Sequence, residues 1–124
     1  VTLTLPQRPT TEQAGAQAFA RVLREAQDQA ILSGQPVGLK LTERGYSVVQ
    51  WRRDLWVPQG VPEILPRRVE IIVQTEGPER PEDWPELVFD PTGIIQPADF
   101  QLRARGVRID ISLDETGEVR LADR

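Results

Sequence analysis

Residues 26–51, AQDQAILSGQPVGLKLTERGYSVVQW, decide the fold because the spacing of apolar residues changes within them. Before Gly34 the apolar residues recur every three or four positions, which is typical of an amphipathic helix. Gly34 suits the left-handed residue that ends a helix, and Pro36 prevents the helix from continuing. Residues 37–41 and 46–51 then form two short apolar stretches around the turn TERG, which indicates a β-hairpin. The chain therefore passes directly from a helix into antiparallel strands.

The helix is expected to span about residues 10–33. Thr10 suits an N-cap, and Gln13, three residues later, can complete a capping box. One face is apolar and is predicted to pack on a sheet; its residues are Phe19, Val22, Leu23, Ala26 and Ala30. The opposite face is polar and charged, and we take it as the candidate assembly face; its residues are Gln17, Arg21, Arg24 and Asp28.

The rest of the chain reads as a series of short strands with a polar, proline-rich loop at residues 75–86. With the hairpin, about seven strands are predicted over residues 36–122. The further ones are 68–74, 86–90, 100–104, 107–113 and 118–121. A helix followed by a run of strands predicts an α+β domain, with one N-terminal amphipathic helix packed on antiparallel sheets. We expect residues 10–124 to form this single domain.

The composition argues against several kinds of catalysis. The 124 residues include no Cys and no His, which excludes thiol nucleophiles, Ser-His-Asp sites and the usual zinc sites. There is no glycine-rich phosphate loop. Carboxylate chemistry remains as a distant alternative, and so does calcium at the acidic loop 114–118. The candidate carboxylates for such chemistry are more simply interpreted as solvated residues of turns and strands. They are Glu70, Asp90, Asp99, Asp110, Asp114 and Glu118. We predict a protein that is not an enzyme, without cofactor or metal.

The net charge of −4 disfavours nucleic acid as a partner and predicts a poor peripheral binder of anionic membranes. The sequence has no Met, even at position 1, so we expect a processed or truncated piece. Residues 1–9 are then expected to be an extended stub that follows a membrane helix.

Two tryptophans are candidate anchors for a partner. Trp56 and Trp84 fall in or beside proline-flanked loops, where an exposed indole can bind a partner. They can equally cap the ends of the β core, and both readings stay open. Together with Trp51 they also allow a third reading, a free-standing β-rich domain that binds a sugar or a peptide.

The order of motifs along the chain resembles the H-type minor pseudopilins of the type II secretion system, the GspH/FimT-like family. The resemblance covers about residues 18–120. It rests on a helix that ends in an Ala-Gln-acidic-x-Ala-Ile pattern before Ser-Gly, then a PVGL strand and a Gly-Tyr hairpin. Further along come WVP, Leu-Pro before a strand, and VFDPTG before an Arg-bearing strand; these lie at residues 56–58, 65–66, 88–93 and 100–103.

This resemblance implies a pilin-like fold with a long N-terminal helix on a β-sandwich-like head. It implies a periplasmic domain anchored in the inner membrane by a helix that precedes it, with other pseudopilins as partners and no small-molecule substrate. It further implies a structural subunit of the secretion pseudopilus, near its tip, that supports export of proteins across the outer membrane. The alternative within the same fold is a minor pilin of a type IV pilus or of a DNA-uptake system.

Overall fold

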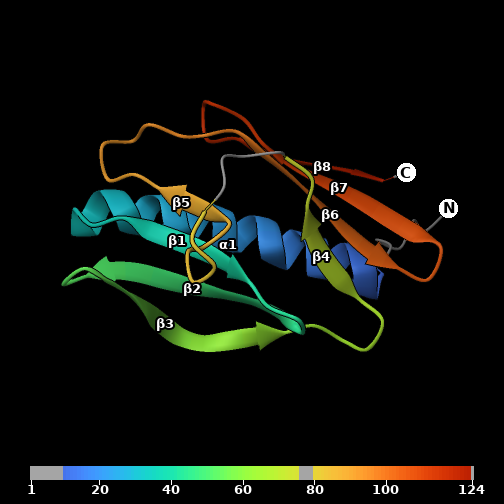
Figure 1. Ribbon diagram of the computed structural model, residues 1–124. Helices are drawn as coiled ribbons and strands as arrows, with labels where there is room; N and C mark the ends of the chain where they lie inside the picture. The colour runs from blue at the N-terminus through green and yellow to red at the C-terminus, as the bar shows by residue number, and fades with distance from the viewer. Residues whose placement is uncertain (1–9, 76–79, 124) are drawn as a thin grey trace, which may run out of the picture.

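The computed structural model describes residues 10–75 and 80–123. The helix α1 comes first and is followed by antiparallel strands (Figure 1). The elements are α1 (Thr11–Ser33), β1 (Val37–Leu41), β2 (Gly45–Arg52), β3 (Leu55–Ile64), β4 (Glu70–Val73), β5 (Leu87–Phe89), β6 (Ala98–Ala104), β7 (Val107–Leu113) and β8 (Val119–Asp123). The α+β class predicted from the sequence is confirmed. The stub expected at residues 1–9 lies outside the described residues.

The strands form two four-stranded sheets. The first has the order β3-β2-β1-β5 and the second has the order β4-β6-β7-β8; every pairing is antiparallel. The helix contacts β1 and β5 of the first sheet and β6, β7 and β8 of the second. In Figure 1 it runs lengthwise against both sheets. One helix therefore provides the common surface on which two separate sheets pack.

Both ends of α1 form as the sequence predicts. Thr10 accepts a hydrogen bond from the Gln13 backbone N–H at 3.1 Å, and the Gln13 side chain accepts one from the Thr10 N–H at 3.0 Å. These two bonds satisfy donors that a helix N-terminus otherwise leaves free. At the other end Gly34 adopts a left-handed φ of 70°, and its N–H donates to the Ala30 carbonyl. Glycine tolerates this conformation because it has no Cβ.

The prediction missed one strand, β3. Its sequence contains Pro58, Gly60 and Pro62, which argue against a strand, so the sequence predicts Trp56 in or beside a loop. In the structure β3 is the outermost strand of its sheet, where a proline that cannot donate a ladder bond is tolerated. A register irregularity between the β2 residues Tyr46 and Val48 accommodates the change of pairing along β3. The prediction of seven strands is therefore wrong by this edge strand.

The core lies where the helix meets both sheets. Phe19 is fully buried between Tyr46 of β2 and Phe100 of β6, with ring centroids 5.0 and 5.1 Å away. The rest of the buried apolar cluster comes from α1 and from strands of both sheets. Within the described residues, no helix is long and apolar enough to cross a membrane.

Candidate functional site

The apolar face of α1 lies where the sequence places it. Phe19, Leu23, Ala26 and Ala30 are each 1% exposed or less, and Val22 is half-buried and packs against the same core. The buried face is wider than the predicted one, because Ala16 and Ala20 are also buried. Alanine at these positions lets the backbone of the helix approach the sheets closely. This face is occupied by the domain's own strands.

One residue of the candidate assembly face bonds to strand β8, and the other three form no hydrogen bond with its described residues. Gln17, Arg21 and Asp28 are exposed. Arg24 is also exposed, but its guanidinium donates to the Val119 carbonyl of β8 at 3.4 Å. One turn further on, Gln27 donates to the Gly117 carbonyl at 3.1 Å. Arg24 and Gln27 therefore tie β8 and the turn before it to the helix, whereas the strip of Gln17, Arg21 and Asp28 stays open to solvent.

The three tryptophans come together in one cluster. Trp51 of β2 faces Trp56 of β3 directly across the strand pair, with ring centroids 5.1 Å apart. Trp84, from the loop before β5, completes the cluster at centroid distances of 5.8 and 5.6 Å from these two rings. Trp51 and Trp56 are half-buried, and Trp84 is 39% exposed. Of the two candidate anchors, Trp84 thus offers the more open surface, while Trp56 mainly packs against other tryptophans.

A short segment fixes Trp84 in this position. The Leu41 backbone N–H donates to the Glu86 carboxylate at 2.6 Å, and the Arg80 guanidinium donates to the backbone carbonyls of Pro85 and Glu86. Pro85 is buried against Gly38 of β1, where an added Cβ would lie 2.8 Å from the Pro85 Cβ. No local pattern in the sequence predicts this packing, because Gly38 and Pro85 are 47 positions apart along the chain.

Four of the six acidic residues considered for catalysis or calcium have side-chain partners in the structure; they are Asp90, Asp110, Asp114 and Glu118. Asp90 accepts hydrogen bonds from the backbone N–H and the hydroxyl of Thr92, at 2.8 and 2.6 Å. Asp114 makes the same pair of bonds with Thr116. The side-chain hydrogen bond from the threonine is the main cause that lowers the pKa of each carboxyl group. Among the described residues, no group of three carboxylates is arranged to hold a metal ion.

Comparisons with known proteins agree with this architecture. The family model for type II transport protein GspH matches residues 15–117. Two solved structures of the minor pseudopilin EpsH from the type 2 secretion system of Vibrio cholerae are similar at 21% identity, with TM-scores of 0.74 and 0.73. They cover 92% and 90% of this chain, which spans 98% and 92% of theirs. The solution structure of E. coli GspH has a TM-score of 0.71 at 21% identity, with 91% of this chain and 88% of that chain covered. A search of curated proteins returned no match.

Proposed function

The chain belongs to the GspH family of type II transport proteins, and we propose that it is a minor pseudopilin of the type II secretion system. In this role it is a structural subunit of the pseudopilus and supports export of proteins across the outer membrane. The observation that carries the proposal is the family match over residues 15–117. The helix packed on two antiparallel sheets is the same fold as that of the V. cholerae minor pseudopilin.

A structural role agrees with the surfaces of the domain. The described residues provide a buried helix face for the head and an exposed strip of Gln17, Arg21 and Asp28 on the same helix. We infer that this strip contacts the helices of neighbouring pseudopilins. Trp84 is fixed on the outside of the head, and we infer that it contacts a neighbouring head near the tip of the filament. The domain then works by contacts and carries out no catalysis.

We infer a periplasmic location for the domain, anchored to the inner membrane through a helix that precedes Thr10. The start of α1 and the end of β8 lie side by side, since the Gln13 side chain donates to Asp123 at 3.4 Å. A membrane anchor on the N-terminal side of α1 would therefore approach the head at the end where these two residues lie.

A complementation assay tests the role in secretion. The native gene is deleted, and the culture medium is assayed for exported proteins after return of the wild-type gene or of the Arg21→Glu variant. We expect wild type to restore export and Arg21→Glu to reduce it while the protein remains present and folded. Restoration of pili or DNA uptake by wild type, with no effect on export, would instead support the type IV pilus alternative.

A further inference from the structure

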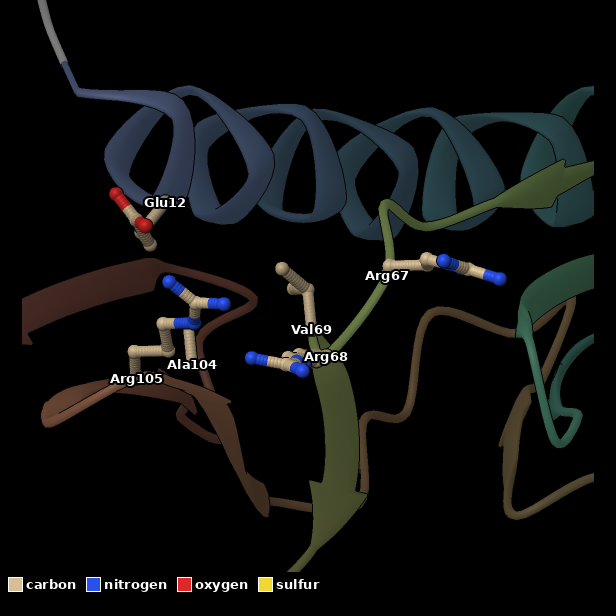
Figure 2. A pocket seen from close by; sticks show the side chains of 6 residues that line it. All are labelled: Glu12, Arg67, Arg68, Val69, Ala104 and Arg105. Carbon is tan, nitrogen blue, oxygen red and sulfur yellow. The ribbon is translucent and has the colours of Figure 1, made fainter.

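Arginines from three separate loops gather at the end of the domain where α1 begins. Figure 2 shows the first of two adjoining hollows there, with a volume of about 280 Å³. In the figure, Arg68 and Arg105 extend into the same space near Glu12 of the helix, whereas Arg67 extends away from it. The second hollow, about 400 Å³, shares Arg67 and Arg68 and adds Arg44 from the β1–β2 turn. We call Arg44, Arg67, Arg68 and Arg105 the arginine end.

The guanidinium groups of the arginine end have no partner within the described part of the chain. All four side chains are exposed, and none forms a hydrogen bond or an ion pair with another described residue. Glu12 and Glu43 line the same hollows, so four positive charges there face two negative ones. Arg108 and Asp123 lie on the adjoining surface near Glu12 and add one charge of each sign. The residues that line these hollows therefore carry a small excess of positive charge, although the chain carries a net charge of −4. Two exposed glutamates, Glu63 and Glu70, adjoin the lining residues Ile64 and Val69 and reduce this excess.

Part of the negative charge lies further along the helix. The turns that contain Asp90 and residues 114–118 lie beside the second half of α1, where Gln27 bonds to Gly117 and Ile95 lies next to that glycine. Exposed charges separated by more than about 10 Å are largely screened at moderate salt. A surface that touches only the arginine end therefore experiences a positive patch, and the net charge of the chain is a poor guide to what this end binds.

Apolar side chains accompany the arginines. Ile64 is 67% exposed and lines the second hollow, and the half-buried Val69 lines both. Exposed aliphatic side chains next to guanidinium groups are typical of surfaces that lie in the headgroup region of a bilayer. An acidic protein partner would also be matched by the arginines, and binding to vesicles without any protein distinguishes the two.

We propose that the arginine end lies on the membrane surface, where Arg44, Arg67, Arg68 and Arg105 bind the phosphates of anionic phospholipids. Guanidinium groups bind phosphate oxygens through paired N–H donors. The proposal rests on the proposed function, because a subunit anchored through a helix that precedes Thr10 presents this end to the bilayer. Headgroup contacts there would set the orientation of the head before the subunit enters the filament.

Vesicle binding tests the proposal directly. The 124-residue domain is co-sedimented, at low and at moderate ionic strength, with vesicles of phosphatidylglycerol and phosphatidylethanolamine, and in parallel with vesicles of phosphatidylcholine. The test variant is Arg67→Gln/Arg105→Gln. The matched control is Arg53→Gln/Arg120→Gln, which changes the net charge equally but removes exposed arginines outside the arginine end. Circular dichroism shows that each variant is folded.

We expect binding to the anionic vesicles alone, weakened by salt. The partition coefficient should fall about 30-fold in the test variant, since each arginine near an anionic surface contributes roughly a fivefold factor. The control should bind like wild type. The proposal would be overturned if the domain does not bind the anionic vesicles, or if both variants lose binding equally. It would also be overturned if the domain binds inorganic phosphate but not vesicles, or binds only acidic protein. Failure of the wild-type gene to restore export would instead refute the proposed function, so the two failures can be told apart.

Discussion

Phe19 of α1 and Phe100 of β6 meet edge to face, with ring centroids 5.1 Å apart and an angle of 89° between the ring planes. Both side chains are fully buried. Phe19 also contacts Tyr46 of the first sheet, so one side chain of the helix joins the cores of both sheets. We therefore expect the domain to depend strongly on Phe19.

Replacement of Phe19 by alanine should destabilise the domain severely. Truncation of a buried phenylalanine typically costs about 3–5 kcal/mol, because apolar contacts are lost and a cavity remains. Urea denaturation followed by circular dichroism measures the free energy of unfolding. Leu32→Ala, on the same helix but 87% exposed, is the matched control and should change stability by less than about 0.5 kcal/mol. A cost below about 1 kcal/mol for Phe19→Ala would show that the two sheets do not depend on this side chain.

Two glycines should respond in opposite ways to alanine. At Gly38 a Cβ would overlap Pro85 and lie 3.1 Å from the Val49 side chain, so Gly38→Ala should destabilise the domain by about 1–3 kcal/mol. At Gly15, inside α1, a Cβ would contact only Leu102, at 3.4 Å. Gly15→Ala should therefore add up to about 1 kcal/mol, the usual gain of helix propensity. Thermal unfolding of both variants checks the signs, and equal effects would contradict the close packing of Pro85 on β1.

The sequence predicted the helix well because its signals are local. The capping box at Thr10 and Gln13 and the left-handed Gly34 act within a few residues, and the structure contains both. Strand β3 was missed because its prolines are acceptable only at a sheet edge, and edge position depends on the order of strands. The tryptophan cluster and the packing of Pro85 on Gly38 also depend on that order. Contacts between residues distant in sequence, such as Arg24 with Val119, left no local pattern to read.

The single tyrosine allows a clean test at alkaline pH. Burial, followed by the negative charge of Glu63, raises the pKa of Tyr46 from 10.0 to about 12. The neutral phenol therefore stabilises the fold, fully below pH 10, and this contribution is lost as the pH rises from 10 to about 12. Tyrosinate absorbance should show a midpoint near pH 12 in the folded domain and near pH 10 in urea. In the Tyr46→Phe variant, the loss of stability between pH 10 and about 12 should be smaller by the part that is due to the phenol. An absorbance midpoint near pH 10 in the folded domain would contradict the burial of the hydroxyl.

Arg21 and Arg24 lie on the same side of α1 but should have different roles. Arg24 donates to the Val119 carbonyl, so Arg24→Ala should destabilise the domain by about 0.5–1.5 kcal/mol, the usual net contribution of one hydrogen bond. Arg21 is exposed and forms no bond with another described residue, so Arg21→Ala should leave the free energy of unfolding within about 0.5 kcal/mol of wild type. Urea denaturation measures both effects.

The same pair of variants separates stability from assembly. If the exposed strip of α1 contacts neighbouring pseudopilins, Arg21→Ala should reduce export in the complementation assay although the domain is as stable as wild type. Arg24→Ala should reduce export only as far as the amount of folded protein falls, which immunoblotting of the cells measures. Normal export with Arg21→Ala and with the charge reversal Arg21→Glu would remove this strip from the assembly surface and leave the Trp84 side of the head as the place to look for it.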